Sequence, residues 1–271
     1  MQLNANKRQY YVGWDVGAWN CENNSRSRDA IVILDSDKDI IGLPWRGNLR
    51  KTINDSKNTQ EWLINIFALC GLNIDLPRSQ VTIAIDTPLG FSDSLRNLLA
   101  GNPVLDEIEY SASNPYLFRA TEQFLFSVGL KPLSSIKDMI GSQATKGIHT
   151  LARFCDINDT CGVWKHANLL TAIEAYPSAC KKSHVIDKLL NQYIDLEWFD
   201  ESEGQVRFKY SVGIEHDDHK DALICALVAW LFDRSPSSLV FPPDDVSLKE
   251  GWIFVPADGL DYGYAQLISD N

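Results

Sequence analysis

The sequence of 271 residues predicts a single α/β domain built on a mixed sheet whose first three strands are antiparallel. Near the N-terminus, β-rich segments are separated only by short polar turns, which is typical of an antiparallel meander. Further along, unbroken apolar runs alternate with helical patterns, as in strands that helices cover on both faces. No internal repeat and no linker rich in Pro, Gly or Ser divides the chain. We therefore expect one domain that spans residues 1–271.

Three strands make up the predicted meander. The first, Tyr10–Asp15, ends in a carboxylate, and the second, Ala30–Leu34, is an apolar run. A turn at Lys38 and Asp39 separates the second strand from the third, which is predicted over Ile40–Leu43. Short turns of this kind join antiparallel neighbours.

The later strands are predicted from apolar runs that carry single acids. Val81–Ile85 is followed directly by Asp86, and Leu169–Ala175 is interrupted only by Glu174. Two weaker segments are expected at the margin of the sheet, a peripheral strand at Arg207–Val212 and a short final strand at Trp252–Val255.

Helical periodicity fills most of the remaining chain. The middle of the chain, about residues 91–166, shows almost no strand signal and is predicted to be a helical insertion in the domain. The apolar residues recur at helical spacing in six segments, which are Thr59–Leu72 (with Thr59 as N-cap), Ser92–Leu99, Pro115–Val128, Asp138–Phe154, Val185–Tyr193 and Asp217–Phe232.

The composition narrows the classes of function. The formal net charge of -11 repels a phosphate backbone on average, which counts against a high-affinity nucleic-acid binder. It counts less against an enzyme, because two bound divalent cations would offset about four of these charges. No apolar run approaches the ~20 residues that span a bilayer, so no membrane contact and a cytoplasmic location are expected. Most of the six scattered cysteines are interpreted as small buried hydrophobes.

Carboxylates recur where a sheet of this kind binds ligands. Asp15 and Asp86 end predicted parallel strands, and Glu174 lies close to such an end. Asp218 and Asp221 are three residues apart, so they share one face in the first turn of the last helix. Hard divalent cations hold clustered carboxylates together. We therefore predict that the same five residues bind Mg²⁺ or Mn²⁺ and carry out catalysis. They are Asp15, Asp86, Glu174, Asp218 and Asp221.

Plainer structural roles remain open for each of these residues. An aspartate at a strand end is often a turn residue, and Asp217 or Asp218 could be the N-cap of the last helix. His216 and His219 flank the acids, but no matching Cys or His spacing completes a zinc site, so we interpret them as solvated. Tyr176 is either a pocket wall or, as we favour, part of the core.

Six short motifs together resemble one protein family. The chain is similar to the family of domains of unknown function numbered 429, predicted nucleases of the ribonuclease H-like superfamily. The motifs follow the family's order and span nearly the whole chain: GWDVG (Gly13–Gly17), IAIDTPLGF (Ile83–Phe91), FRATEQFL (Phe118–Leu125), AIEAYPSA (Ala172–Ala179), HDDHKDALICALVAW (His216–Trp230) and EGWIFVP (Glu250–Pro256).

The resemblance implies a ribonuclease H-like fold, a five-stranded mixed sheet with its first three strands antiparallel. It also implies metal ligands on the first strand, on a later strand and on the final helix, where Asp218–Ala222 resembles the DxxDA pattern of Holliday-junction resolvases. The family-like RxTE motif gives Arg119, Thr121 and Glu122 as substrate-binding residues, with Arg119 on a phosphate oxygen. A buried Arg–Glu pair is the equal alternative for Arg119 and Glu122.

Three functions follow as hypotheses. The first is a divalent-metal-dependent phosphodiester hydrolase that acts on a nucleic acid or a small phosphoester. The second is a non-catalytic module that uses its acidic face to bind a protein partner. The third, less favoured, is a phosphotransferase of the actin and sugar-kinase superfamily, because no glycine-rich phosphate loop follows Asp15. The sequence leaves the substrate and the oligomeric state open.

Overall fold

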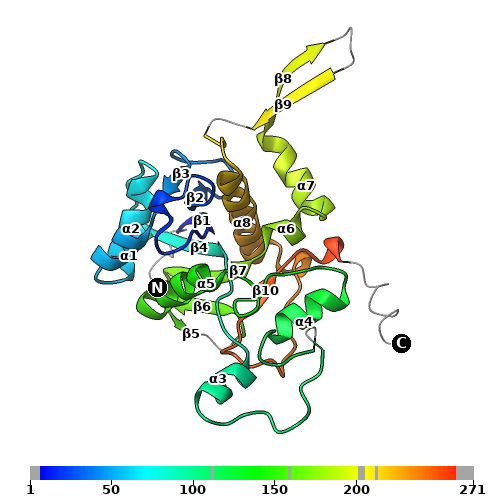
Figure 1. Ribbon diagram of the computed structural model, residues 1–271. Coiled ribbons are helices and arrows are strands. Elements are labelled where there is room, and N and C mark those ends of the chain that lie inside the picture. The colour runs from blue at the N-terminus through cyan, green and yellow to red at the C-terminus, as the bar shows by residue number, and fades with distance from the viewer. Residues whose placement is uncertain (1–6, 111–112, 158–159, 201–204, 211–212, 261–271) are drawn as a thin grey trace, which may run out of the picture.

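The centre of the molecule is a mixed sheet. The computed structural model describes residues 7–110, 113–157, 160–200, 205–210 and 213–260. Seven strands lie in the order β3-β2-β1-β4-β7-β6-β5, and β10 pairs with β7 beyond the end of β6 (Figure 1). The strands of this sheet are β1 (Arg8–Asp15), β2 (Asp29–Leu34), β3 (Trp45–Gly47), β4 (Ser79–Asp86), β5 (Asp156–Ile157), β6 (Val163–His166), β7 (Leu170–Ala175) and β10 (Ile253–Phe254).

The pairing directions confirm the α/β class and the meander. β1 pairs antiparallel with β2, and β2 with β3, while β4 runs parallel to β1 and β7 parallel to β4. The predicted third strand, Ile40–Leu43, is wrong. Ile40 makes only an isolated bridge with Leu34, because Gly42 takes a left-handed φ of 67° and Leu43 turns outward with 66% of its surface exposed. The third strand follows later, at Trp45–Gly47.

Helices cover both faces of the sheet. They are α1 (Arg50–Asp55), α2 (Thr59–Leu69), α3 (Asp93–Leu99), α4 (Ala120–Ser127), α5 (Gly141–Phe154), α6 (Pro177–Cys180), α7 (His184–Leu190) and α8 (Asp217–Arg234). All six predicted helices are present, although α4 begins five residues later than expected. The N-cap of α2 is Asn58 rather than Thr59, because the Asn58 side chain accepts a hydrogen bond from the Glu61 amide. In the described part of the chain, no helix has the length and apolarity to cross a membrane.

The insertion is not entirely helical, and the sheet is larger than five strands. β5 and β6 lie within residues 91–166 and extend the sheet beyond β7. Both are short, and β6 carries Lys165 and His166, so their sequences lack a clear strand pattern. A separate hairpin consists of β8 (Ile194–Asp200) and β9 (Gln205–Tyr210). β9 matches the predicted peripheral strand as far as Tyr210, and residues 211–212 lie outside the described residues.

Two apolar cores lie on opposite faces of the sheet, as the alternation of strand side chains requires. On one face, Tyr11 and Ala84 pack with α8, which Figure 1 shows lying across the sheet. On the other face, Val12 and Ile83 pack with α1, α2 and α5. All six cysteines are buried and free, as predicted for most of them.

Gly13 allows α8 to approach the centre of the sheet. A Cβ atom at position 13 would overlap the carbonyl oxygen of Ala222 and lie 2.5 Å from the amide nitrogen of Ala226. Only a residue without a side chain fits this contact. The close approach brings the N-terminal turns of α8 to the edge of the sheet where β1 ends.

Replacing Gly13 with alanine should destabilise the protein by about 2–3 kcal/mol or more, because the overlapping atoms are backbone and cannot rotate away. Urea denaturation measures the loss. Gly141→Ala is the matched control, since a Cβ there would meet its nearest atom at 3.4 Å. Equal stability of the two variants would contradict the close packing of α8 on β1.

Candidate active site

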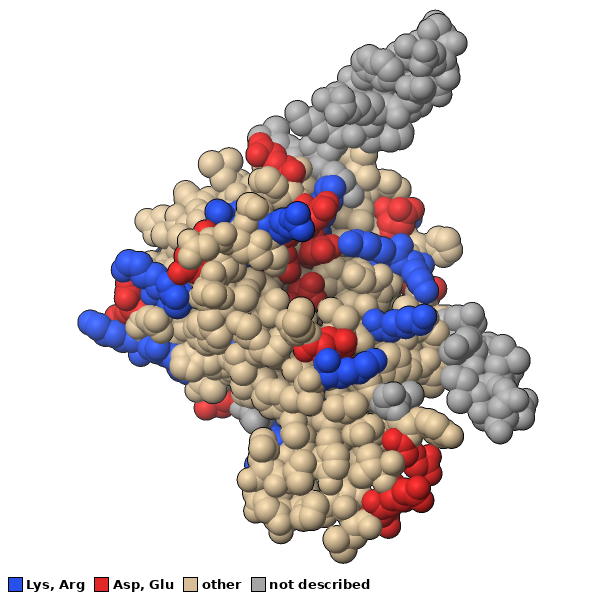
Figure 2. Space-filling model, in the orientation of Figure 1, with Lys and Arg blue, Asp and Glu red and all other residues tan. Residues whose placement is uncertain are grey.

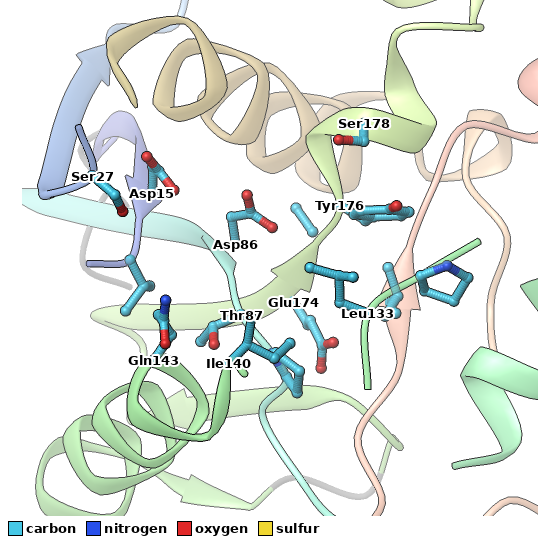
Figure 3. A pocket seen from close by; sticks show the side chains of 15 residues that line it. Asp15, Ser27, Asp86, Thr87, Leu133, Ile140, Gln143, Glu174, Tyr176 and Ser178 are labelled. Atoms are coloured by element: carbon cyan, nitrogen blue, oxygen red, sulfur yellow. The ribbon is translucent and has the colours of Figure 1, made fainter. Parts of the chain in front are cut away.

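Asp15 and Asp86 lie side by side at the carboxyl ends of β1 and β4. The parallel register pairs Asp15 directly with Asp86, so both side chains project from the same face of the sheet, toward α8 (Figure 3). Both residues are partly exposed and line a pocket of about 210 Å³. The prediction that these two acids share one site is therefore consistent with the structure.

Neither carboxylate has a hydrogen-bond or ion-pair partner among the described residues. Removal from water and repulsion by Asp86 raise the pKa of Asp15 well above its usual value. Removal from water, and then repulsion by Asp221 and Glu174, raise the pKa of Asp86 to about 8. The pair is thus a concentration of negative charge that a proton or a cation must offset.

The acids of α8 are close to this pair but are already compensated. Asp218 accepts hydrogen bonds from Arg46 Nε at 2.7 Å and from the Arg28 amide at 3.0 Å. Asp221 forms an ion pair with Lys181 Nζ at 2.9 Å. Figure 2 shows acidic side chains gathered beside α8 and α6, with basic side chains around them. The helix N-cap is His216, so Asp217 and Asp218 are not capping residues.

Glu174 faces the other side of the sheet. Its register partner in β4 is Ile85, one residue before Asp86, and a shift of one residue reverses the direction of the side chain. Glu174 Oε1 accepts from Arg119 Nη2 at 2.7 Å, and Oε2 accepts from the Leu89 amide at 2.9 Å. Glu174 lines the pocket, but its carboxylate is paired, so its predicted role as a catalytic metal ligand does not fit this placement.

Arg119 has no free donor for a substrate. Its guanidinium donates to Glu122, Glu174 and the backbone oxygen of Glu250, which uses every N–H bond that it has. Its side chain is only 3% exposed. The predicted contact with a phosphate oxygen does not fit this arrangement, in which Arg119 forms the buried Arg–Glu pair that the sequence left as the alternative.

Thr121 and Glu122 are structural for the same reason. Thr121 is fully buried, and its hydroxyl accepts a hydrogen bond from the Ile253 amide at 3.0 Å. Glu122 accepts from the Arg119 amide at 2.7 Å and closes a capping box at the start of α4. The substrate-binding role predicted for both residues does not fit, because neither reaches the pocket. The RxTE motif instead fixes α4 to β7 and β10.

The pocket has one acidic side and one largely apolar side. Tyr176 lies in its wall and also packs against a small apolar cluster, with its hydroxyl donating to the backbone oxygen of Lys131. Among the described residues the lining contains no lysine or arginine. It consists of Asp15, Val16, Ser27, Asp86, Thr87, Pro88, Pro132, Leu133, Ile140, Gln143, Glu174, Ala175, Tyr176, Ser178 and Ile253.

A buried ion pair beside the site escaped the sequence analysis. Lys146 of α5 and Asp29 of β2 are fully buried and in contact. The same carboxylate accepts from the Gly17 amide at 2.9 Å and from Trp14 Nε1 at 3.1 Å. Lys146 also donates to the Gly17 carbonyl oxygen at 3.2 Å. The pair therefore fixes the loop that follows Asp15. In the sequence, the only indication of this pair is Asp29, a charged residue directly before the predicted strand Ala30–Leu34.

His216 and His219 differ in environment. His219 is buried, although it was expected to be solvated, and its Nε2 atom has no hydrogen-bond partner. Burial and the neighbouring His216 lower the pKa of His219.

Among the described residues, no three His, Cys, Asp or Glu side chains are already arranged as a metal-binding group. A cation would therefore start from Asp15 and Asp86 and draw further ligands from nearby.

Comparisons with protein-family models, with curated proteins and with solved structures each found no match.

Replacing Arg119 with methionine should cost about 3–5 kcal/mol of folding free energy, because it leaves Glu122 and Glu174 buried without their cation. Thermal and urea denaturation measure the loss. Arg50→Met, which removes an exposed ion pair with Glu22, should cost less than about 1 kcal/mol. An Arg119 variant of wild-type stability would show that Arg119 is not a structural residue.

Asp86→Asn should stabilise the protein increasingly as pH rises. The folded pKa of about 8 exceeds the ordinary value of 3.8, so folding favours the protonated acid. The wild type keeps this contribution in full below about pH 4 and loses it as pH rises through about 8. We expect a gain of about 1–2 kcal/mol near pH 8.5 and a smaller gain near pH 5 in metal-free urea denaturation. The exposed Asp55→Asn variant should show no such trend; a flat profile for Asp86→Asn would contradict the raised pKa.

Proposed function

We propose that the protein is a divalent-metal-dependent phosphodiester hydrolase in which Asp15 and Asp86 hold Mg²⁺ or Mn²⁺. One observation carries the proposal. Two acids stand side by side at the carboxyl ends of adjacent parallel strands, and neither has a partner among the described residues. Open α/β sheets bind ligands at this edge. An uncompensated pair of carboxylates is costly unless a ligand or a proton offsets it.

The ribonuclease H-like classification is part of the same proposal. The order β3-β2-β1-β4-β7, with its antiparallel first three strands, agrees with what the family resemblance implies. A long helix, α8, packs across this sheet and begins with Asp218 and Asp221 beside the strand acids. β5 and β6 are additions to that arrangement. The resemblance to the family numbered 429 supports this classification by its motifs alone.

The donor set suits a hard cation. Carboxylate oxygens are the ligands that Mg²⁺ and Mn²⁺ prefer. Asp221 is a candidate to join Asp15 and Asp86, since its charge raises the pKa of both, and its ion pair with Lys181 is partly exposed. When bound, the metal would lower the pKa of a water molecule and polarise a phosphoryl oxygen. The chain itself would orient that water and stabilise the carboxylates.

The net charge of the protein and the size of the pocket favour a small substrate over a long nucleic-acid duplex. The net charge of -11 opposes a phosphate backbone, and a pocket of about 210 Å³ is smaller than the ~300–1,000 Å³ of drug-sized sites. We therefore expect a small phosphoester, or a single phosphodiester unit of a nucleic acid, to enter it.

A thermal melt with Mn²⁺ tests the proposal. At a metal concentration about a hundred times Kd, the wild type should melt roughly 5–10 °C higher than without metal, since bound ligand stabilises the folded state. Asp15→Asn should lose this rise and any Mn²⁺-dependent hydrolysis of bis(p-nitrophenyl) phosphate, while Asp217→Asn, an exposed acid of the same region, should keep both.

The contrary outcome is equally specific. A wild type that shows neither a Mn²⁺-dependent rise nor hydrolysis would exclude the hydrolase and leave the non-catalytic module as the better interpretation of the acidic face.

A further inference from the structure

The proposed hydrolase needs a group that holds the phosphate, and Arg119 cannot supply it. All donors of Arg119 are used within its buried network. The described lining of the pocket offers no other arginine and no lysine. The donors must therefore come from neutral groups. Figure 3 shows what faces the acids across the pocket, namely the beginning of α5 with Ile140 and Gln143, and Thr87 beside them.

The first turn of α5 has free backbone donors. The helix has 14 residues and no side-chain cap at its N-terminus. Its earliest backbone hydrogen bond to the N-cap runs from the Ala144 amide to the Ile140 carbonyl oxygen. Within the described residues, the amides of Gly141, Ser142 and Gln143 have no acceptor. A helix N-terminus with free N–H groups favours an anion through both hydrogen bonding and the helix dipole.

Two polar side chains at the same place lack partners. Thr87 is only 5% exposed, and its hydroxyl makes no hydrogen bond with any residue that the structure describes. Its methyl group packs against α5 at Gly147, where an added Cβ would lie 2.5 Å away, so the orientation of the side chain is constrained. Gln143 Oε1 is likewise buried and unpartnered. The Gln143 amide can rotate to present its NH₂ group to the pocket. An unsatisfied buried hydroxyl is costly, and a phosphate oxygen that accepts a hydrogen bond from Thr87 would recover that cost.

We propose that the first turn of α5, with Gln143 and Thr87, is a phosphate-binding subsite. This proposal rests on the hydrolase function and specifies how its substrate is held. A non-bridging oxygen of the phosphoester accepts hydrogen bonds from α5 and Gln143, while Asp15 and Asp86 face the group from the opposite side. The apolar wall at Leu133 and Tyr176 contacts the organic portion of the ester. Gln143 and Thr87 are positioning residues for the phosphate.

In the proposed subsite, neutral donors hold the phosphate on one side of the pocket, and the carboxylates of Asp15 and Asp86 lie on the other side. Donors without formal charge attract phosphate without neutralising Asp15 and Asp86, which a lysine or arginine in the pocket would do. Phosphate and carboxylates repel one another unless a cation or a proton lies between them. The subsite should therefore bind phosphate weakly in the metal-free wild type and more tightly once the acids are neutralised.

Binding of inorganic phosphate tests the subsite without requiring turnover. Isothermal titration of the Asp15→Asn/Asp86→Asn double variant, without metal, should show phosphate binding at least about tenfold tighter than in the metal-free wild type. In that background, Gln143→Leu and Thr87→Val should each weaken binding by about tenfold. Gln60→Leu on α2, an exposed glutamine, is the matched control and should have no effect.

Stability separates a binding role from a structural one. Thr87→Val preserves shape and removes an unpaired hydroxyl, so this variant should be as stable as the wild type or more stable while it binds phosphate less well. A destabilised Thr87→Val variant whose affinity for phosphate is unchanged would overturn the role of Thr87. Phosphate binding that neither Gln143→Leu nor Thr87→Val weakens would overturn the subsite.

Two further arms distinguish the subsite from the proposed function and identify the source of the phosphate. Phosphate binding that depends on Gln143 in a protein without Mn²⁺-dependent hydrolysis would support the subsite and exclude the hydrolase. Mn²⁺-dependent hydrolysis that is unaffected by Gln143→Leu would support the hydrolase and exclude the subsite. Displacement of phosphate by a thymidine dinucleotide more strongly than by diethyl phosphate would identify a nucleotide ester, and equal displacement a small ester. In either case, displacement that Gln143→Leu weakens supports the subsite.

Discussion

The in-register parallel pairing of β1 with β4 places Asp15 directly beside Asp86, and the other features of the site depend on that alignment. Gly13 lets α8 lie close above the same strands, so that helix adds Asp218 and Asp221 to the negative charge. The buried pair of Asp29 and Lys146 fixes the loop after Asp15 from the other side. Three separate contacts therefore hold like charges together at one edge of the sheet. A fold that needed only stability would gain by separating them.

Protons and divalent cations are alternative ways to offset this charge, and they compete for the same oxygens. The pKa of Asp86, raised to about 8, means that a proton on this acid can offset part of the charge in the metal-free protein near neutral pH. A cation that binds between the two acids must release that proton, so its affinity rises with pH. Asp218 and Asp221 are held in ion pairs with Arg46 and Lys181, so in the proposed metal site these contacts would have to loosen before either acid could act as a ligand.

Local patterns in the sequence predicted the strand acids, α8 and the meander, because each depends on a few neighbouring residues. Asp15 and Asp86 were placed correctly because both end apolar runs, and parallel strands end at one edge. Glu174 was correctly predicted to lie near the end of a parallel strand, but the direction of its side chain depends on the register of β7 against β4, which no local pattern specifies. The two roles left open for Arg119 could not be separated by sequence for a related reason. An arginine that binds phosphate and one that neutralises two buried glutamates have the same local sequence, and only the packing of α4 against β7 separates them.

The network around Arg119 still serves the site, although it touches no substrate in this arrangement. Glu174 also accepts a hydrogen bond from the Leu89 amide, and Glu250 accepts from the amides of Asp93 and Ala120. These bonds fix the segment that follows Asp86 to β7 and to the insertion. Thr87 belongs to that segment and packs against α5 at Gly147, so the network sets the distance between the acids and the first turn of α5. The site therefore separates its tasks. Buried charge pairs maintain the geometry, while the unpaired groups at the pocket are those to which the proposed cation and phosphate would bind.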